Sequence, residues 1–273
     1  MDQHTNSKEL FKYMVSCITL KESQGEIESI VYLVMHSIFG LRREHIIAEK
    51  QVTYDDVELN DIIKRINSYE PIQYILQEAE FYGRLFYVSK DVLIPRPETE
   101  LLVEEVIRHA KNTAVRIVDL GTGSGCIAVT LACELPNASV MATDISSAAI
   151  DIAHKNSLTF NTYVEFFLSD VLTDEIPEAD IIVSNPPYIT KEEMTSMNKN
   201  VVGYEPHLAL FVDDNDPLIF YKSIAGKKAK AVFVEINERF GAEVKSIFIA
   251  NGYKAEIIKD IDNKDRIVKA IYE

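Results

Sequence analysis

Four consecutive residues near the middle of the chain, Asn185-Pro186-Pro187-Tyr188, combine free acceptor oxygens with few hydrogen-bond donors. They follow Ala179–Ser184, a largely apolar run of the kind that forms a buried strand. Because proline has no backbone N–H, the two prolines remove two donors and stiffen the segment, while every carbonyl oxygen remains. The side-chain oxygen of Asn185 and the carbonyl of Pro186 could accept the two N–H bonds of a planar amine, and the Tyr188 ring could pack on it. We therefore predict an acceptor site for a planar –NH2 group; a rigid exit from a strand is the simpler alternative.

A glycine loop with an acid downstream is the second feature that could do chemistry. Gly121, Gly123 and Gly125 follow a strand-like run and precede an apolar helix, so the backbone can turn sharply there and come close to a ligand. Their spacing, G-x-G-x-G, differs from the G-x-G-x-x-G of dinucleotide cradles. Asp144 ends the next predicted strand about twenty residues later, where an acid is placed to accept two hydrogen bonds from a ribose diol. Alternatively, Asp144 could cap the next helix, although Ser146 could serve there instead.

The glycine loop and Asp144 together favour S-adenosylmethionine over NAD as the cofactor. The loop would bring close backbone to the amino-acid end of the cofactor, and no pyrophosphate has to be cradled. Asp170 ends the third predicted strand, where such a residue often faces an adenine amine, with Val171 against the ring. A strand-end turn explains Asp170 nearly as well.

Methyl transfer to a planar amine makes specific demands on these residues. The nitrogen lone pair is delocalised into a carbonyl or a ring, so the amine is a poor nucleophile. Two acceptors, from Asn185 and Pro186, would orient the N–H bonds and enrich the nitrogen in electron density. Transfer then depends on positioning and electrostatics more than on a strong base, and the proton leaves after the nitrogen has become cationic. Two substrate classes fit: the exocyclic amine of adenine or cytosine, and the side-chain amide of a protein glutamine.

The elements that must position these residues begin with a helical region. Residues 1–75 are predicted as a small helical domain, in which Ser23 opens a capping box and Gly40 ends the helix that follows. Thr53 is predicted to start a second helix, and Pro71 to end it.

The rest of the chain shows a hairpin and then an alternation of strands and helices. Residues 76–97 are predicted as a hairpin and a stiff, proline-rich linker. Residues 98–273 alternate helices with short strands rich in Val and Ile, which is typical of buried parallel strands. A polar turn at Asp262-Asn263-Lys264 indicates that the last strand runs antiparallel. We predict an α/β fold with a doubly wound, mostly parallel sheet of the S-adenosylmethionine-dependent methyltransferase (Rossmann-like) type, preceded by the small N-terminal helical domain. The predicted strands span 115–121, 138–145, 162–170, 179–185, 230–236, 253–261 and 265–273, and the predicted helices 98–112, 126–136, 147–157, 216–227 and 238–252.

Composition limits the class of protein. The chain has 273 residues, 47% of them hydrophobic, so it can bury a sizeable core. Its formal net charge of −15 makes it a poor binder of a phosphate backbone, which disfavours a nucleic-acid substrate. The three cysteines and six histidines show no metal-ligand spacing, so no metal site is expected. No signal-peptide pattern and no apolar run of membrane-spanning length is present, so a cytoplasmic protein without a membrane partner is expected.

Five motifs extend the comparison beyond the loop residues. They are "PIQYIL…AEFYG…F.V…LIPRPETE" over Pro71–Glu100, "DLGTGSG" over Asp119–Gly125, "TDIS" over Thr143–Ser146, "NPPYI" over Asn185–Ile189 and "YEPHLAL" over Tyr204–Leu210. On these motifs the chain resembles the protein-(glutamine-N(5)) methyltransferases of the PrmC/HemK type, or release factor glutamine methyltransferases. These enzymes modify the glutamine of the Gly-Gly-Gln loop in peptide chain release factors. "IPRPETE" together with "YEPxxAL" would not be expected in a nucleic-acid amine methyltransferase.

The resemblance implies S-adenosylmethionine as cofactor, S-adenosylhomocysteine as product and class 1 release factors as protein substrates, with the helical domain helping to hold them. Asn185, Pro186 and Tyr188 are implied to be catalytic. Arg96 and Glu98 are implied to line the approach to the site, although an ion pair in the linker explains them equally well. A monomer that does not bind nucleic acid directly is expected. The expected cofactor-binding residues are Gly121, Thr122, Gly123, Ser124, Gly125, Asp144, Asp170, Val171 and Asn185, and the expected substrate-binding residues are Asn185, Pro186, Pro187, Tyr188, Arg96 and Glu98.

Three positions depart from the family pattern. Gln77 stands where glycine is usual after "QYIL", which leaves open a different turn there. Asn237 replaces a usual glycine, and Phe240 stands where a glutamine is common. Both are expected to lie away from the methyl-transfer loop and to affect partner contacts more than chemistry. Two other functions stay open: a nucleic-acid exocyclic-amine methyltransferase, and a non-catalytic module that keeps the fold and binds a partner. The intact set of loop residues argues against the second.

Overall fold

The computed structural model describes residues 2–272, and its tertiary contacts separate the chain into two compact units. The first, called the N-terminal unit, runs to Gln77 and includes the segment Asn198–Tyr204. The second, called the sheet unit, contains Glu78–Met197 and the residues from Glu205 onward.

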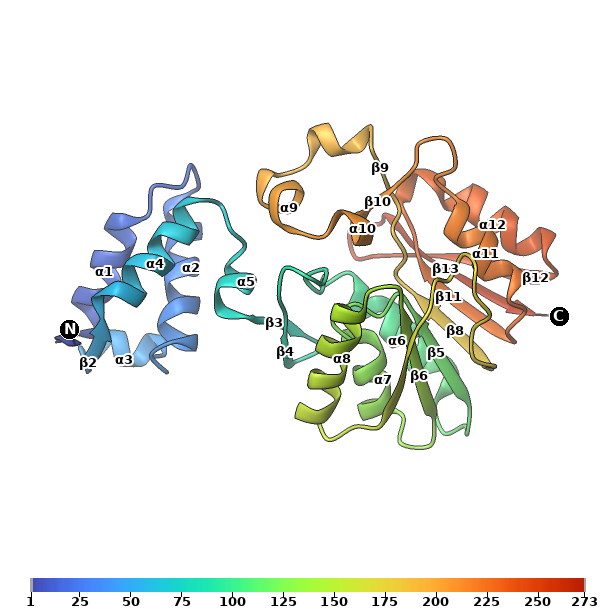
Figure 1. The fold of residues 1–273 in the computed structure, drawn as a ribbon, viewed down its shortest axis with the longest axis horizontal. Coiled ribbons are helices and arrows are strands. Elements are labelled where there is room, and N and C mark those ends of the chain that lie inside the picture. Colours follow the sequence, from blue (N-terminus) through green and yellow to red (C-terminus); the bar gives the residue numbers. More distant parts are fainter. Residues whose placement is uncertain (1, 273) are drawn as a thin grey trace. The chain divides into compact units, whose positions relative to one another are not determined.

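Helices form most of the N-terminal unit (Figure 1). Each of the longer helices turns an apolar stripe inward, and residues such as Leu10, Val31 and Ile63 meet in one buried core. The helices are α1 (Ser7–Cys17), α2 (Gln24–Ser37), α3 (Arg43–Ile47), α4 (Asp56–Asn67), α5 (Ile72–Leu76) and α9 (Lys199–Tyr204).

One predicted helix start in this unit is confirmed and another is wrong. Ser23 caps α2 as predicted, because its side chain accepts the N–H of Glu26. Thr53 starts no helix but lies in β2 (Gln51–Asp55), which pairs antiparallel with β1 (Asp2–Asn6). The partner strand β1 lies at the start of the sequence, so the residues around Thr53 alone could not reveal the pairing.

Asp55 is the residue that caps α4. Its Oδ1 accepts the N–H of Val57 at 2.8 Å and of Glu58 at 3.1 Å, and a carboxylate also suits the positive end of the helix dipole. The prediction that Pro71 ends this helix is wrong, since α4 ends at Asn67. Pro71 instead precedes α5, a position where its missing N–H costs nothing.

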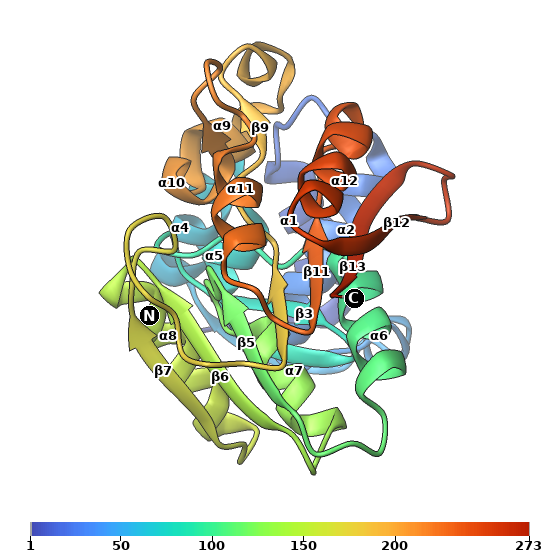
Figure 2. The same ribbon diagram turned by 90° about the vertical axis from the view of Figure 1, so that its right-hand side faces the viewer.

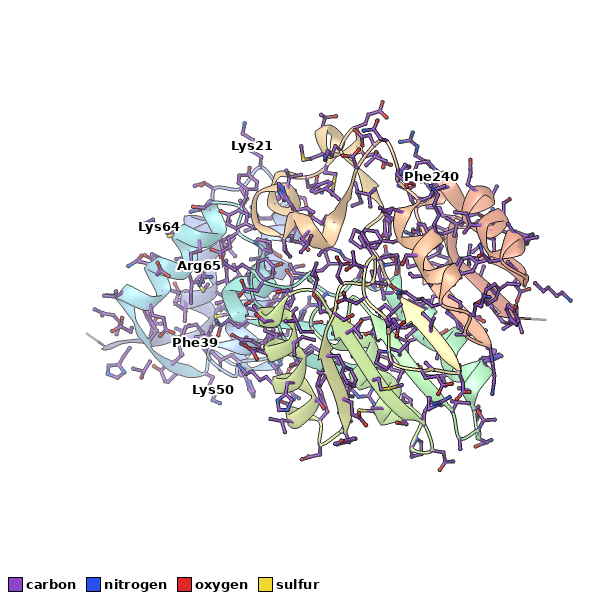
Figure 3. The ribbon with its side chains drawn as sticks, turned by 45° about the vertical axis from the view of Figure 1, so that its right-hand side comes forward. Lys21, Phe39, Lys50, Lys64, Arg65 and Phe240 are labelled. Atoms are coloured by element: carbon purple, nitrogen blue, oxygen red, sulfur yellow. The ribbon has the colours of Figure 1, made fainter. Side chains whose placement is uncertain are left out.

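Residues close in sequence stabilise the C-terminal ends of α4 and α5. Lys64 and Arg65 lie in the last turn of α4 (Figure 3), where cations suit the negative end of the dipole. Arg65 also donates to both carboxylate oxygens of Glu70, at 2.6 and 2.8 Å. Gln77 ends α5 in the left-handed conformation (φ 57°) that glycine adopts most readily. The turn is therefore made without glycine, at a cost of about 1–2 kcal/mol.

A seven-stranded sheet in the order β12-β13-β11-β8-β5-β6-β7 forms the centre of the sheet unit (Figure 1). The five strands from β11 to β7 are parallel, and β13 runs antiparallel to both of its neighbours, which confirms the predicted fold class and the predicted last strand. The strands are β5 (Arg116–Leu120), β6 (Ser139–Asp144), β7 (Val164–Leu168), β8 (Ile181–Ser184), β11 (Ala231–Glu235), β12 (Tyr253–Lys259) and β13 (Asp265–Tyr272).

Helices cover both faces of this sheet (Figure 2). Alternate residues of β5 point to opposite faces, so Ile117 joins one core and Val118 the other. The first core takes its helical residues from α6 (Thr99–Ala110) and α7 (Cys126–Glu134), beside which lies α8 (Ser147–Thr159). The second takes them from α11 (Ile219–Gly226) and α12 (Gly241–Ala250). This is the doubly wound arrangement that the sequence pattern predicts.

Short elements complete the sheet unit. A hairpin of β3 (Glu78–Phe81) and β4 (Arg84–Tyr87) places Phe81 and Phe86, both fully buried, in the core with α6 and α7. The segment after β8 holds a parallel pair, which no sequence pattern predicted. The remaining elements are β9 (Ile189–Thr190), β10 (Phe211–Val212), α10 (His207–Leu210) and two 3-10 helices, η1 (Glu193–Ser196) and η2 (Glu238–Phe240).

Candidate active site

The ends of three neighbouring strands bring the predicted residues together. Leu120 at the end of β5 lies opposite Thr143 of β6 and Ser184 of β8. The residues that follow these three, namely the glycine loop, Asp144 and Asn185, therefore leave the sheet side by side at its carboxyl edge. The chain also reverses its winding between β5 and β8, which is the switch point where ligands of such sheets bind.

The glycine loop uses most of its own N–H groups internally. The N–H groups of Gly121 and Thr122 both donate to the carbonyl of Thr143, each at 2.9 Å, and the N–H of Gly123 donates to Oδ2 of Asp144 at 2.9 Å. A loop that cradles phosphate would leave such donors free for the anion. The loop therefore suits a ligand group that needs close backbone rather than a pyrophosphate.

The three loop glycines serve different physical needs. Gly121 and Gly123 have φ of 74° and 54°, the left-handed region, and a Cβ at either position would meet no atom within 4 Å. Gly125 also has positive φ, 79°, but a Cβ there would lie 2.9 Å from Cβ of Ala153 in α8. The first two thus keep space open, and the third permits close packing of loop and helix.

Asp144 holds the turn after β6 with both oxygens. Oδ2 accepts from Gly123 N, and Oδ1 accepts from Ser146 N at 2.9 Å. The helix-cap alternative for Asp144 does not apply, because Ser146 caps α8 by accepting the N–H of Ala149. Burial raises the pKa of Asp144, while these N–H donors oppose the rise. Each oxygen retains a further lone pair that could accept a ligand hydroxyl.

A buried acid lies behind the loop that sequence reasoning did not single out. Asp119 in β5 is fully buried, and the hydroxyl of Thr122 donates to its Oδ2 at 2.6 Å. Burial raises the pKa of Asp119 to about 7, with the nearby Asp144 carboxylate adding to the rise. The sequence did contain a signal for Asp119: an acidic residue lies within an otherwise largely apolar strand. Burying a carboxylate in such a strand costs free energy, so an acid there indicates a specific role.

Asn185 is held by a short chain of hydrogen bonds. Its Nδ2 donates to Oγ1 of Thr99 at 3.2 Å, and that hydroxyl donates to Oε2 of Glu235 at 2.7 Å. The hydroxyl of Tyr188 donates to the other oxygen, Oε1, at 3.0 Å. Burial raises the pKa of Glu235, and the two hydroxyl donors oppose this. Thr99 and Glu235 were missed by sequence reasoning, although Glu235 lies next to the end of a predicted strand and Thr99 belongs to "IPRPETE".

A cavity of about 240 Å³ opens at this edge of the sheet. Its walls combine many apolar groups with a few polar ones, which is typical of a small-molecule site. It is lined by Asp91, Val92, Leu93, Leu120, Gly121, Gly123, Asp144, Ile145, Ser146, Ala149, Ser169, Asp170, Val171, Leu172, Ser184, Asn185, Pro186, Pro187, Pro206, Leu208, Ala209 and Phe220.

Eight predicted site residues meet in this cavity and six lie elsewhere. Those in its wall are Gly121, Gly123, Asp144, Asp170, Val171, Asn185, Pro186 and Pro187. Thr122, Ser124 and Gly125 lie on the inner side of the loop; Ser124 is buried, and its carbonyl accepts from the Asn156 side chain. Tyr188 packs against the core that contains α11 and α12, with its hydroxyl on Glu235. Arg96 and Glu98 are the other two.

Arg96 and Glu98 are not paired with each other. Arg96 Nη2 donates to Oε1 of Glu205 at 2.6 Å, and the N–H of Ile94 donates to Oε2 of the same carboxylate at 3.3 Å. Glu205 is only 4% exposed, so its buried carboxylate holds the linker residues Ile94 and Arg96 in place. Glu98 is exposed at the start of α6.

Asp170 and Val171 form the turn after β7. Oδ1 of Asp170 accepts the N–H of Leu172 at 2.9 Å, which is the strand-end turn role. The Val171 side chain packs against the core, and its carbonyl accepts from Ser223 at 2.7 Å. Both residues also line the cavity, so the turn role and a ligand role are compatible.

The expectation that Asn237 lies away from the methyl-transfer loop is wrong. Its Nδ2 lies 3.3 Å from the carbonyl of Tyr188 and 3.1 and 3.2 Å from the two oxygens of Glu193. The reason is that β11 pairs with β8, so the residues after both strands meet at one edge of the sheet. Phe240 packs against the core on the α12 side (Figure 3).

Membrane spans and metal clusters are both absent from residues 2–272. In that range no helix is long and apolar enough to cross a bilayer. The same residues contain no group of three or more His, Cys, Asp or Glu side chains placed to hold a metal ion.

Comparison with known proteins gives a consistent result. The family model described as "Methyltransferase small domain" matches residues 97–203. The release factor glutamine methyltransferase of Flavobacterium psychrophilum is 40% identical over 262 residues, which cover 90% of this chain and 92% of that one. The enzyme of the same name from Bacillus subtilis is 37% identical over 282 residues, 96% of each chain. A methyltransferase of Pyrococcus furiosus shares the fold, with a TM-score of 0.51 at 16% identity over 78% of this chain and 98% of that one.

Proposed function

Because the chain belongs to the release factor glutamine methyltransferase family, we propose that it methylates the glutamine of the Gly-Gly-Gln loop in class 1 peptide chain release factors. The methyl group comes from S-adenosylmethionine and goes to the side-chain amide nitrogen of that glutamine. The reaction modifies a protein that acts in translation termination.

One observation carries the proposal. Asn185 lies in the cavity wall, and the –NH2 end of its amide faces Thr99, to which one of its two N–H bonds is donated. Its Oδ1 is therefore the end available to a ligand. An amide –NH2 is a donor, so an acceptor at this point of the cavity matches a glutamine side chain.

The residues present fit the cofactor. Asp144 would accept the ribose hydroxyls, the backbone at Gly121 and Gly123 would adjoin the amino-acid end, and Asp170 would accept the adenine amine with Val171 against the ring. A loop whose N–H groups are used internally suits a cofactor without pyrophosphate. When bound, the cofactor supplies a methyl group on a sulfonium and leaves as S-adenosylhomocysteine.

The protein's own contribution is orientation. Asn185 Oδ1 and the Pro186 carbonyl would accept the two N–H bonds of the glutamine amide and so aim the nitrogen lone pair. The same acceptors stabilise positive charge on the nitrogen as the N–C bond forms. One of the two N–H protons then leaves, which restores the neutral amide. Tyr188 would exclude water on the side of its ring.

Several finer assignments belong to the same proposal. Arg96 and Glu98 would line the approach of the release factor, and the helical domain would hold it. The proposed domains are then residues 1–75, which would recognise the substrate, a hairpin and linker at 76–97, and the methyltransferase domain at 98–273. The enzyme would act as a monomer in the cytoplasm, without direct contact to nucleic acid, in keeping with its net charge of −15.

Mass spectrometry tests the proposal directly. The chain is incubated with S-adenosylmethionine and a class 1 release factor, and tryptic peptides are examined for one added methyl on the loop glutamine. A release factor with Gln→Ala in the loop is the substrate control, and Asp262→Ala, at an exposed turn, is the enzyme control. Labelling that survives the Gln→Ala change would contradict the assignment, and labelling of purified DNA or RNA would favour a nucleic-acid amine as substrate.

A further inference from the structure

We infer that Glu235, acting through the hydroxyl of Thr99, is a positioning residue that keeps the Asn185 amide in the one orientation that accepts from a glutamine. The inference rests on the proposed function, since it explains how the acceptor of that reaction is maintained. It concerns two buried groups that line no part of the cavity.

An asparagine side chain has two nearly equivalent orientations. Rotation by half a turn exchanges its acceptor oxygen for its –NH2 donor at almost no steric cost. If Asn185 presented –NH2 to the cavity, donors would face the donors of a glutamine amide. Something at the other end of the Asn185 side chain must therefore select the orientation.

Thr99 alone cannot make this selection. Its Oγ1 lies 3.2 Å from the Asn185 amide, but a hydroxyl can both donate and accept. With its proton free to rotate, Thr99 would satisfy either end of the asparagine. The direction of the hydrogen bond has to be imposed on Thr99 from outside.

Glu235 imposes that direction. Its Oε2 lies 2.7 Å from the Thr99 hydroxyl and its Oε1 3.0 Å from the Tyr188 hydroxyl. These two donors and the positive charge of Arg266 favour the ionised carboxylate, which has acceptors only. The one Thr99 proton is therefore directed at Glu235, and only lone pairs remain for Asn185. The amide responds by donating its –NH2 to Thr99, which leaves Oδ1 for the cavity.

The same carboxylate also holds the far end of the Asn-Pro-Pro-Tyr segment. Oε1 of Glu235 accepts the Tyr188 hydroxyl at 3.0 Å. Two bonds to one buried carboxylate thus hold the first residue of the segment indirectly and the last residue directly. Because Glu235 is 1% exposed and Thr99 2% exposed, water does not compete for these bonds.

The fold explains why these groups meet. Val234 of β11 lies opposite Ser184 of β8, so Glu235 stands beside Asn185 as both strands end. Thr99 is the first residue of α6, which packs against β11. No local sequence signal links positions so far apart in the chain.

The test replaces Thr99 and Glu235 in turn and measures kcat and cofactor affinity separately for each variant. Thr99→Val removes the hydroxyl at constant shape, Thr99→Ser restores it, and Glu235→Gln gives the carboxylate position an –NH2 donor. Thr99→Val and Glu235→Gln should lower kcat about 10–100-fold, the range found when groups that hydrogen-bond to metal ligands and orient them are removed. Cofactor affinity by calorimetry should stay unchanged, and Thr99→Ser should retain most of the activity.

Matched variants control for the effect of altering buried polar groups. Thr130→Val alters another fully buried threonine, whose hydroxyl has no partner within residues 2–272. Glu105→Gln alters a buried glutamate of α6 that pairs with Arg108. Both should leave kcat unchanged.

A second readout separates orientation from simple loss of structure. Peptides carrying the Gly-Gly-Gln loop, or the same loop with Gln→Glu, are compared for binding to each variant in the presence of S-adenosylhomocysteine. The wild type should prefer glutamine, because Oδ1 of Asn185 faces a donor. In Thr99→Val the asparagine is free to rotate, so this preference should fall about tenfold.

The outcomes separate the inference from the function on which it rests. A wild-type enzyme that methylates release factors, together with Thr99→Val and Glu235→Gln variants of normal kcat and normal glutamine preference, would overturn the inference alone. Equal losses in the Thr99→Val and Thr99→Ser variants would also overturn it. A wild-type enzyme that neither methylates a release factor nor distinguishes the two peptides would overturn the proposed function.

Discussion

Replacement of Gly125 by alanine should destabilise the glycine loop and the helix packed on it. Gly125 has φ of 79°, and a Cβ there would lie 2.9 Å from Cβ and 3.0 Å from Cα of Ala153. An L-residue in the left-handed conformation costs about 1–2 kcal/mol, and an extra methyl in a packed contact about 1–3 kcal/mol. The free energy of unfolding of Gly125→Ala should therefore fall by roughly 2–5 kcal/mol.

Thermal unfolding measures this loss. At about 2–4 °C per kcal/mol for a unit of this size, Tm should fall by roughly 4–20 °C. Gly121→Ala is the matched control, because φ there is also positive, 74°, but nothing lies within 4 Å of the added methyl. It should show only the backbone cost of about 1–2 kcal/mol.

A double mutant separates the two contributions. Ala153→Gly removes the atom that the new methyl would meet, so the loss caused by Gly125→Ala should shrink in that background by about 1–3 kcal/mol. Identical Tm losses for the Gly125 and Gly121 variants, with no rescue by Ala153→Gly, would refute the packing argument. The cost of the left-handed backbone conformation alone would then explain the loss of stability in both variants.

Four further predictions concern the site and the N-terminal unit. Asn185→Ala should lower turnover of the release factor at least about 100-fold while sparing cofactor affinity by calorimetry, since the lost acceptor acts on the transition state. Asp144→Ala should instead weaken S-adenosylmethionine binding by about 1.5–3 kcal/mol with little effect on kcat at saturation, and the reverse pattern in this pair would contradict the assigned roles. Asn237→Gly removes the donor to the Tyr188 carbonyl. The free energy of unfolding should fall by about 1 kcal/mol, and Tm by a few degrees; an unchanged Tm would show that this bond is dispensable. The N–H groups of Glu58 and Val57 lower the pKa of Asp55, so its stabilisation is present above the ordinary aspartate pKa and is lost as pH falls through the lower folded value. Tm measured from about pH 5 to 2.5 should therefore fall more steeply in the wild type than in Asp55→Asn, and parallel curves would exclude this contribution.

Patterns with a short range predicted much of this protein. The alternation of Val- and Ile-rich strands with helices correctly indicated the doubly wound sheet, and the polar turn before residue 265 correctly indicated the antiparallel last strand. Ser23 and Ser146 were recognisable as helix caps because capping involves residues within one turn. The glycine loop and Asp144 could be linked because a strand, a turn and a helix have nearly fixed lengths.

The errors concern residues whose role depends on a distant partner. Thr53 has a capping side chain, but a pairing with β1 draws it into a strand. Asn237 was expected to lie away from Asn185-Pro186-Pro187-Tyr188. About fifty residues separate them along the chain, yet β11 and β8 are neighbours in the sheet. Strand order across the sheet is a property of the tertiary structure, and no spacing within a single strand encodes it.

The sequence by itself determined the class of fold, the glycine loop and the donor-poor segment at Asn185, because each depends on residue types at close spacing. Only the tertiary structure decided how that segment is held. It placed Thr99 and Glu235, from elements far away in the chain, behind Asn185, where a buried carboxylate can direct a hydroxyl proton and through it an amide. Hydrogen-bond direction is a property of assembled neighbours, and neighbours of this kind exist only once the sheet has formed.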